Sequence, residues 1–457
     1  MRIAFVSANR ERLPDEVVPV GLLYVMASTP AHHETVLWDL CFEEAPQDFL
    51  GARLREFQPD VVALGLRNLQ NSDYSGSMDN LSYFASLVET VRANTAAPLV
   101  LGGGGFSVIA RGMMQRLRPD YGVLGEGERP FAQLLEALES RVTGAERDAQ
   151  LSAIGSLHHW REGQLVSNPP ARDFVVLDAL PPPDRRHVDP RHYQRVGIDS
   201  VQTKRGCPMQ CTYCTYPLIE GNRGRLRDPD AVVDEMLRAL EVQPDIKHFF
   251  VVDSTFNLPT RHAKAVCEAM VRRGLRTPWT CYANPMGFDA ELAELMARAG
   301  CAGMEVGSDS GCDDVLLRLR KGFTTARIRE FHRLAADAGL RDCHTFVLGS
   351  LGETLDHVRR SLDFIVDLDP YAAILMAWTD DDEAMDPELR KQRTAFRAQI
   401  LELLREAQGA FPRWIIPPLQ VNFDPRLFRW LRGKGLHGPL WQHIRMLPPE
   451  PAPARVA

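Results

Sequence analysis

Residues 200–214 read SVQTKRGCPMQCTYC, a short strand pattern followed at once by a loop with three cysteines. Cys207, Cys211 and Cys214 are spaced C-x3-C-x2-C, which brings three thiolates together on one tight loop. A closed structural zinc site uses four protein ligands, usually in two C-x2-C pairs or with histidines nearby. A ferredoxin cluster likewise takes four thiolates. The loop therefore predicts a four-iron cluster on which one iron remains open to another ligand.

The remaining cysteines and the chain start bear on the cellular compartment. Six of the nine cysteines are scattered, as inert core cysteines are. A cluster motif among nine cysteines indicates a reducing cytoplasm rather than a disulfide scaffold. The opening MRIAFVSANRER lacks the shape of a signal peptide, and no apolar run approaches the ~18 residues of a membrane span. We expect a cytoplasmic protein without a transmembrane segment.

Bulk composition bounds the size and the partners. The 457 residues predict two or three domains. An apolar content of 45% and a charged content of 25% are ordinary for a globular protein. The formal net charge of −7 argues against a broad nucleic-acid surface. We therefore expect a small-molecule substrate rather than a nucleic acid.

Strand and helix patterns alternate six times between residues 197 and 380. Helix start signals separate the strands, among them Asp228-Pro229 and Asp289. Six βα units predict a partial (β/α)6 TIM-like barrel, with its chemistry at the carboxyl ends of the strands. The cysteine loop follows the first of these strands. The expected strands are 200–204, 247–252, 279–282, 303–307, 343–348 and 372–378.

Residues 1–140 show a second βαβ rhythm, which predicts a doubly wound Rossmann-like sheet with a ligand at its carboxyl edge. Two glycine clusters, 102–105 and 125–128, fall at that edge, and neither is a G-x-G-x-x-G motif. Glycines there allow the backbone to approach a large planar or phosphate-bearing ligand. The expected strands are 2–8, 34–40, 61–67, 98–102 and 121–124.

Two further regions complete the predicted organisation. Residues 141–196 form a connector with a hairpin that turns at Gly163. Residues 381–457 form a mostly helical C-terminal region after an acidic run at 380–383, and its tail 449–457 is expected to lack order. The Trp-, Arg- and His-rich stretch 428–447 is a candidate lid or membrane-surface contact. A packing role, closing the open side of the barrel, is the favoured alternative.

The cysteine loop, with Tyr213 just before its last cysteine, resembles that of the radical S-adenosylmethionine (SAM) enzymes. The resemblance implies a 4Fe-4S cluster whose open iron chelates SAM. It implies an external electron donor of flavodoxin or ferredoxin type as well. Reductive cleavage of SAM would then give a 5′-deoxyadenosyl radical that abstracts hydrogen from the substrate.

Later strand ends extend this resemblance to the SAM site. Residues 253–255 stand where the family usually has Gly-Gly-Glu, and Asp309 replaces the glutamate of a Glu-Ser motif. Gly349 opens a turn similar to Gly-x-Pro-Gly-Glu-Thr. For Asp253, Glu305 and Asp309, a structural role such as helix capping is an equal alternative. The implied SAM-binding residues are Tyr213, Asp253, Ser254, Thr255, Asn284, Glu305, Ser310 and Gly349.

The glycine clusters and residues 19–24 resemble the cobalamin-binding domain fused ahead of many radical SAM enzymes. The D-x-H-x-x-G motif that supplies a histidine to cobalt is absent, so Leu66, Arg67 and Asn68 are the candidates for the lower side of cobalt. A degenerate Rossmann scaffold is the alternative. The implied cobalamin-binding residues are Pro19, Gly21, Leu22, Leu66, Arg67, Asn68, Gly103, Gly104, Gly105, Gly125, Glu126, Gly127 and Glu128.

Together, the resemblances imply a cobalamin-dependent radical SAM enzyme. The leading hypothesis is a methyltransferase that adds methyl from methylcobalamin to an unactivated carbon of a small molecule or natural-product intermediate. Radical rearrangement, cyclisation or ring contraction without methyl transfer is the first alternative, and a non-catalytic cobalamin or redox sensor is the second. Methylthio transfer is disfavoured, because no extra cysteine cluster precedes the barrel. No catalytic side chain is identified, and neither Cys281 nor Cys343 has support as a hydrogen donor.

Overall fold

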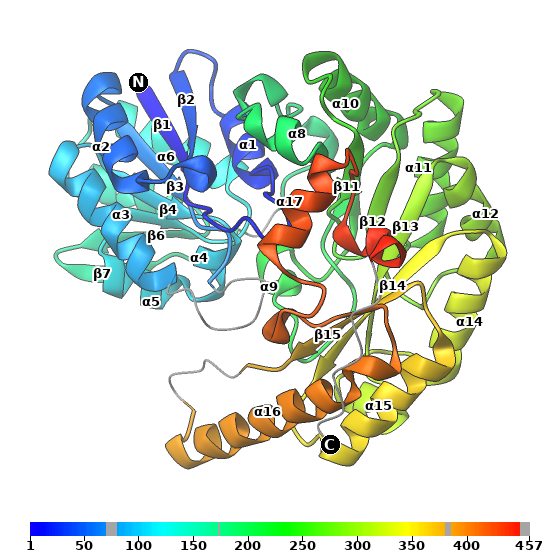
Figure 1. Ribbon diagram of the computed structural model, residues 1–457. Coiled ribbons are helices and arrows are strands. Elements are labelled where there is room, and N and C mark those ends of the chain that lie inside the picture. Colours follow the sequence, from blue (N-terminus) through cyan, green and yellow to red (C-terminus); the bar gives the residue numbers. More distant parts are fainter. Residues whose placement is uncertain (70–79, 172–173, 380–384, 448–457) are drawn as a thin grey trace.

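Two β-sheets stand side by side in the computed structural model (Figure 1), which describes residues 1–69, 80–171, 174–379 and 385–447. The N-terminal sheet is drawn in blue and cyan, and the second sheet runs from green to orange. The expected acidic run at 380–383 and the tail 449–457 lie outside the described residues. In the described part of the chain, no helix is long and apolar enough to cross a membrane.

The N-terminal sheet has seven strands in the order β2-β1-β3-β4-β5-β6-β7. Its first five strands are parallel, which confirms the predicted Rossmann-like sheet, and the β6–β7 hairpin adds to its edge in antiparallel fashion. Gly163 occupies the hairpin turn with φ 77°. The strands are β1 (Arg2–Ser7), β2 (Glu34–Asp39), β3 (Val61–Gly65), β4 (Leu99–Gly102), β5 (Tyr121–Val123), β6 (Leu157–Arg161) and β7 (Gln164–Ser167).

Helices cover both faces of this sheet. Alternate residues of a strand point to opposite faces, and here both sets are apolar. Val6 and Leu64 pack in one core cluster, while Phe5 and Val100 pack in another on the opposite face. Burial on both faces is what a doubly wound parallel sheet requires. The helices are α1 (Val20–Ala27), α2 (Pro46–Phe57), α3 (Asn80–Asn94), α4 (Gly104–Val108), α5 (Ala110–Leu117), α6 (Glu128–Glu139) and α7 (Gly144–Ala153).

The second sheet is wholly parallel, in the order β16-β15-β14-β13-β12-β11-β8. The six predicted strands are present, and the two-residue β16 (Trp414–Ile415), too short to show a pattern, comes from the C-terminal region. The other strands are β8 (Ile198–Val201), β11 (His248–Val251), β12 (Trp279–Ala283), β13 (Cys301–Asp309), β14 (Arg341–Leu348) and β15 (Ala372–Ala377).

The helices after these strands begin where the sequence places their caps. Asp228 accepts a hydrogen bond from the Ala231 amide and Asp289 from the Leu292 amide, so each satisfies an unpaired N–H of a helix start. Figure 1 shows these helices along the outer side of the sheet. They are α10 (Pro229–Val242), α11 (Thr260–Arg272), α12 (Ala290–Arg298), α13 (Asp313–Arg318), α14 (Thr325–Asp337) and α15 (Leu355–Leu368).

The inner face of the second sheet is only partly covered, and we call the space along it the lumen. On β13, Met304 and Val306 are fully buried in the same core cluster as Phe331 of α14. Glu305 and Gly307 alternate to the other face, and they are half-buried rather than buried. The same alternation of buried and half-buried positions continues along β14 and β15. The half-buried positions are Glu305, Gly307, Thr345, Val347, Ile374 and Met376.

Besides supplying β16, the C-terminal region packs against the second sheet at two places. Helix α16 (Pro387–Ala407) reaches the turn after β14, where Arg393 donates to the Gly349 carbonyl oxygen at 2.7 Å. Residues 425–447, which include α17 (Pro425–Gly433), pack against the amino ends of the strands. Tyr371, before β15, donates to the Gln442 carbonyl oxygen at 2.7 Å, and His437 Nδ1 lies 3.1 Å from the Val196 carbonyl oxygen before β8. The segment rich in Trp, Arg and His therefore closes the end of the lumen opposite the cysteine loop.

Candidate active site between the two sheets

The cysteine loop follows β8 and β9 (Lys204–Arg205) and runs into the short helix α9 (Tyr216–Glu220). Gly206 has φ 84°, and a Cβ there would collide with the Arg223 carbonyl oxygen. Only glycine fits that turn without strain. The Cys207 amide donates to the Gly221 carbonyl oxygen at 3.2 Å and the Cys214 amide to the Cys211 carbonyl oxygen at 3.2 Å. The backbone thereby folds all three cysteines around one point.

The spacing of the three sulfur atoms suits a cluster better than a single ion. Among the described residues, two clusters hold three ligand atoms within 4.8 Å of one another, and the cysteine trio is neither of them. In a tetrahedral zinc site with Zn–S bonds of ~2.3 Å, sulfur atoms stand about 3.8 Å apart. Cys207 is buried, and Cys211 and Cys214 are half-buried. The donor set and its spread fit three corners of an iron–sulfur cluster.

A triad of the half-buried Tyr213 and the buried Asp309 and Lys321 lies against this loop. The Tyr213 hydroxyl donates to Asp309 Oδ2 at 2.5 Å. Lys321 Nζ lies 2.7 Å from the same carboxylate oxygen and donates to the Tyr213 hydroxyl oxygen at 3.1 Å. Burial, followed by the neighbouring Asp309 carboxylate, raises the pKa of Tyr213 above its usual range. The triad fixes Tyr213, the aromatic residue of the motif, beside the cluster position.

In the strand-end segment 253–255, two residues are hydrogen-bonded to the start of the cysteine loop and one side chain is left without a partner in the described residues. Asp253 is buried and accepts a hydrogen bond from the Thr203 amide at 2.8 Å, and the Lys204 side chain donates to the Thr255 carbonyl oxygen. Asp253 and Thr255 thus brace the start of the cysteine loop. The Ser254 hydroxyl is buried and has no hydrogen-bond partner in the described residues. An orphaned hydroxyl at a strand end is a plausible ligand contact, because leaving it unpaired costs free energy.

The other residues expected at SAM are spread over a wider region. Asn284 is bonded through its backbone amide to Asn257 and through its side chain to the Met286 amide. Ser310 Oγ accepts from the Cys312 amide at 3.2 Å. Glu305 faces the lumen four residues before Asp309, and a register shift between Gly307 and Asp309 turns the strand end toward Tyr213. Asp309, rather than Glu305, is therefore the carboxylate beside the cysteine loop.

Gly349, the last residue expected at SAM, keeps a backbone role. It has φ 95°, and a Cβ there would stand 2.7 Å from the Ile400 side chain of α16. Its amide donates to Glu353 Oε2 at 2.7 Å. The turn after β14 thus depends on glycine for both its conformation and its contact with α16.

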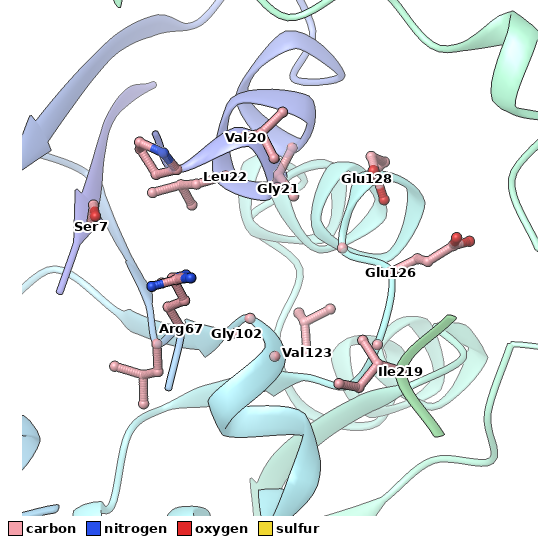
Figure 2. Close-up of a pocket in the computed structure, with 18 of the residues that line it drawn as sticks. Ser7, Val20, Gly21, Leu22, Arg67, Gly102, Val123, Glu126, Glu128 and Ile219 are labelled. Carbon is pink, nitrogen blue, oxygen red and sulfur yellow. The ribbon is translucent and has the colours of Figure 1, made fainter. Parts of the chain in front are cut away.

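A cavity of about 380 Å³ lies where the carboxyl edges of the two sheets meet (Figure 2). Ligand sites commonly have volumes of 300–1,000 Å³. The N-terminal domain supplies most of its wall, while Ser200, Gln202, Val252 and Tyr282 come from the second sheet. Of the residues expected at cobalamin, all line this cavity except Asn68 and Gly105. These lining residues are Pro19, Gly21, Leu22, Leu66, Arg67, Gly103, Gly104, Gly125, Glu126, Gly127 and Glu128.

The glycines of this wall fall into two kinds. Gly103 has φ 96°, and a Cβ there would lie 2.6 Å from the Leu66 carbonyl oxygen, so this glycine lets two strand-end loops touch. Gly105 likewise packs against the backbone of Arg67. At Gly21, in contrast, a Cβ would meet no atom within 4 Å. Gly21 leaves room that a ligand could fill.

Three residues were candidates for the lower side of cobalt, and Arg67 is the one whose polar side chain reaches the cavity. Figure 2 shows it among the lining side chains. Its Nη1 lies 3.9 Å from Glu11 Oε2. Asn68 donates to the same carboxylate oxygen of Glu11 at 2.9 Å and does not line the cavity. Leu66 contributes apolar wall. A flat ligand resting on the glycine loops would therefore have a guanidinium, and no histidine, among its polar neighbours here.

Glu126 and Glu128 link the two domains through arginines. Arg205, which immediately precedes the Gly206-Cys207 turn, lies 2.7 Å from Glu128 Oε1 and 3.3 Å from Glu126 Oε1. Arg225 lies 2.5 Å from Glu126 Oε1. Arg205, Glu126 and Glu128 are nearly inaccessible to solvent, with side-chain exposures of 4–9%. We call these four residues the interdomain clamp.

The clamp is the part of the site that sequence reasoning missed. The two glutamates were expected to contact cobalamin. The structure also pairs both with Arg205, while Glu128 Oε2 has no partner in the described residues. The flanking position of Arg205 in the motif was visible in the sequence. Its partners, more than 75 residues earlier in the chain, had no local signal.

The fold and the site together define a class: a sheet domain with a ligand cavity at its carboxyl edge, facing a parallel-sheet domain that bears a three-cysteine cluster loop. Residues 6–135 match the B12 binding domain, and residues 201–365 match the Radical SAM superfamily. The chain belongs to the B12-binding radical SAM enzyme family. The predicted cofactor set of 4Fe-4S cluster, SAM and cobalamin is confirmed at the level of this family.

Curated relatives extend over most of the chain. Tryptophan 2-C-methyltransferase from Streptomyces laurentii is 29% identical over 431 residues, which cover 80% of this chain and 70% of the relative. An uncharacterized methyltransferase from Pyrococcus horikoshii is 25% identical over 364 residues, 79% of this chain and 75% of the relative. Anaerobic magnesium-protoporphyrin IX monomethyl ester cyclase from Synechocystis is 25% identical over 350 residues, 74% of this chain and 66% of the relative. The relatives include both methyltransferases and a cyclase.

A solved structure shares the whole architecture. The radical S-adenosylmethionine methyltransferase TsrM from Kitasatospora setae, with cobalamin and a 4Fe-4S cluster bound, superimposes with a TM-score of 0.81. The match covers 97% of each chain at 23% sequence identity. The two proteins therefore have the same fold from the N-terminal sheet through the C-terminal region.

Proposed function

We propose that this chain is a methyltransferase that adds a methyl group to an unactivated carbon of a small molecule, with cobalamin and SAM as cofactors. The observation that carries the proposal is the cavity at the junction of the two sheets, which the cobalamin-type loops and the second sheet line together. Two reactive centres must reach one substrate carbon, and placing them across one cavity meets that need. The TsrM structure, which contains cobalamin and a 4Fe-4S cluster, has the same domain arrangement.

Each cofactor has a matching set of residues. Cys207, Cys211 and Cys214 would hold the cluster, and the orphaned Ser254 hydroxyl lies at the next strand end for SAM. The loops around Gly21 and Gly104 would hold cobalamin, since both line the cavity. When bound, the cluster with SAM supplies a carbon-centred radical, and cobalamin supplies a methyl carrier.

The protein itself contributes placement and protection. Lys321 and Asp309 hold Tyr213 in one orientation beside the cluster loop. The interdomain clamp fixes that loop against the cavity wall, so the spacing between the two cofactor sites is set by buried ion pairs. The C-terminal segment 425–447 closes the far end of the lumen, which limits the access of water to a radical.

Cyclisation or another radical rearrangement is the second candidate. The similarity to the magnesium-protoporphyrin IX monomethyl ester cyclase favours it specifically. Both reactions would use the same cofactor sites. The mass of the product distinguishes them, because a transferred methyl in place of hydrogen adds about 14 mass units.

The test uses protein reconstituted without oxygen, with iron and cobalamin loading measured first. It is incubated with SAM, a reductant and a panel of candidate substrates, and both 5′-deoxyadenosine and methylated products are sought by mass spectrometry. We expect both, and SAM with a deuterated methyl group should transfer its label to the product. The Cys211→Ala variant is the matched control and should form neither.

Three outcomes would revise the proposal. Deoxyadenosine with an unmethylated, cyclised product would favour the second candidate. Tight cofactor binding without any cleavage of SAM would favour a sensor. If the protein carries its cluster and forms no 5′-deoxyadenosine with any substrate, the radical mechanism would be ruled out.

A further inference from the structure

Glu305 is a carboxyl group on the inner face of the second sheet, in the middle of β13. Its neighbours across the sheet are Tyr282 of β12 and Cys343 of β14. The side chain is half-buried, whereas Met304 and Val306 on either side are fully buried against helices. Because Glu305 points away from those helices, the surface it exposes borders the lumen.

The lumen around Glu305 is largely apolar and partly aromatic. Tyr282 is 38% exposed and also lines the interdomain cavity. Its ring packs against Phe250 with 4.9 Å between ring centroids. Half-buried Ile374 and Met376 face the lumen from β15. A substrate in this space would meet hydrocarbon and aromatic surface, with a carboxyl group on one side.

In the described residues, Glu305 has one neutral hydrogen-bond donor and no cation to stabilise a negative charge. Among the described residues, its one hydrogen-bond partner is the Trp441 indole, which donates to Oε1 at 2.8 Å. Asp309, further along the same strand, is by contrast paired with Lys321. Burial raises the pKa of Glu305 to about 7, and the Trp441 hydrogen bond opposes that rise. A buried carboxylate without a cation is costly, and a cationic ligand would relieve that cost.

Trp441 places this group at the closed end of the lumen. It belongs to the segment that covers the amino ends of the strands, and a Cβ at Gly303 would stand 2.5 Å from its ring. Glu305 therefore lies just above the floor that Trp441 forms. Asp309, at the cysteine loop, lies four positions after Glu305 on β13, a span of about 13 Å in an extended strand.

We propose that Glu305 is a substrate-binding residue that holds a positively charged nitrogen of the substrate. The substrate is then a small molecule with an apolar body and a protonated amine or similar cation. The amine end lies at the floor of the lumen, and the carbon that reacts lies at the remote end of the molecule, near the cysteine loop. This inference rests on the proposed function, since it takes the lumen as the place where the substrate is bound.

Binding measurements test this assignment without requiring turnover. The reconstituted holoenzyme is titrated with three indoles that differ in charge: tryptamine, tryptophol and indole-3-acetate. Hexylamine, hexanol and hexanoate form a second series with an aliphatic body. We expect the amine of at least one series to bind ten times or more tighter than its neutral and anionic counterparts. Equal affinities within both series, or no binding by either amine, would overturn the proposal.

The Glu305→Gln variant shows whether this carboxyl group is responsible. Glutamine keeps the size of the side chain and an oxygen that can accept from Trp441. We expect amine binding to weaken at least tenfold, while binding of the neutral alcohol changes less than twofold. Unchanged amine binding in a variant with normal cluster and cobalamin content would contradict the assignment.

These outcomes separate the inference from the proposed function. Selective amine binding by an enzyme that makes no methylated product would leave Glu305 assigned and the reaction wrong. Methylation of a neutral substrate by a protein without amine selectivity would support the proposed reaction and refute the assignment of Glu305. If Glu305→Gln fails to load its cofactors, the wild-type titrations still test the predicted selectivity for a cation, and equal affinities there overturn the proposal.

Discussion

The two ends of the second sheet are built differently, although the same strands form both. At the carboxyl ends lie the cysteine loop, the unpartnered Ser254 hydroxyl and the Tyr213–Asp309–Lys321 triad. At the amino ends, residues 425–447 fill the space with aromatic rings and satisfied backbone groups. The contrast teaches that one end is left open for ligands and the other is closed by the chain itself. Glu305 stands between them, supported by the closed end and exposed to the lumen.

The largest expected effect comes from the cysteines at the open end. Replacing Cys214 with alanine removes one of three cluster ligands, so bound iron should be lost and 5′-deoxyadenosine formation should fall by about a thousandfold or more. Iron analysis and a deoxyadenosine assay measure both. Cys267→Ala, a buried cysteine of α11, is the control and should retain its iron. A Cys214→Ala protein with full iron would refute the cluster assignment.

Filling the cobalamin-type cavity should have the next largest effect. Gly21→Phe places a ring where a Cβ would meet nothing within 4 Å, and we expect cobalamin to bind about a hundredfold more weakly, a loss of ~2.7 kcal/mol. Equilibrium binding followed by corrin absorbance measures the change. Gly112→Phe is matched, because Gly112 is also a helical glycine with open space around it but does not line the cavity. Equal affinities for both variants would place cobalamin elsewhere.

The interdomain clamp should affect both stability and coupling. Arg205→Ala leaves the nearly inaccessible Glu126 and Glu128 without their shared cation, at a cost of about 3 kcal/mol. Thermal unfolding measures that loss, and the ratio of methylated product to deoxyadenosine measures the coupling, which we expect to fall. Arg92→Ala breaks an exposed pair with Asp120 and should cost less than about 1 kcal/mol. A stability loss without any change in the product ratio would leave the clamp a purely structural device.

The pH dependence of stability tests the environment of Glu305. Its pKa is raised from 4.5 to about 7 in the folded chain, so the folded state holds the proton more tightly than the unfolded state. Wild-type stability should therefore fall relative to Glu305→Gln as pH rises from about 5 to 7, by about 2 kcal/mol, and should stay lower above pH 7. Denaturant titrations at several pH values give the difference. Parallel curves for the two proteins would show that the carboxyl group is well solvated.

The smallest expected effect is at the closed end. Trp441→Phe keeps the ring but removes the donor to Glu305, and should cost about 1.5 kcal/mol in the free energy of unfolding, with cluster loading unchanged. Trp430→Phe, at a side chain that is 45% exposed, should cost less than about 0.5 kcal/mol. Loss of the cluster in Trp441→Phe would show that the two ends are not independent.

Much of the open end could be predicted from the sequence, because its signals are local. Three cysteines in eight residues, glycines at strand ends and capping aspartates each act through neighbours in the chain. The closed end carried no such signal. The contact between Trp441 and Glu305 joins residues 136 positions apart, and its basis is packing at the floor of the lumen, which no spacing rule encodes.

The clamp shows the same limit from another direction. Glu126 and Glu128 follow a strand end, which is the sequence signal that pointed to them, and both line the cavity. Their partner Arg205 belongs to the other domain, and its choice of partner depends on how the two sheets meet. The sequence shows Asp309 as a substitution in a motif. It does not show the irregularity in the strand that turns Asp309 toward Tyr213.

The most direct measurement of the central claim is the metal content and absorption spectrum of the protein purified without oxygen and supplied with cobalamin. Two carboxyl edges at one cavity predict about four iron atoms and one corrin per chain, with both the cluster and the corrin bands present. Gly21→Phe should then lose the corrin and keep the iron. A protein that holds its cluster yet binds no cobalamin would contradict the claim that the two domains form one active site.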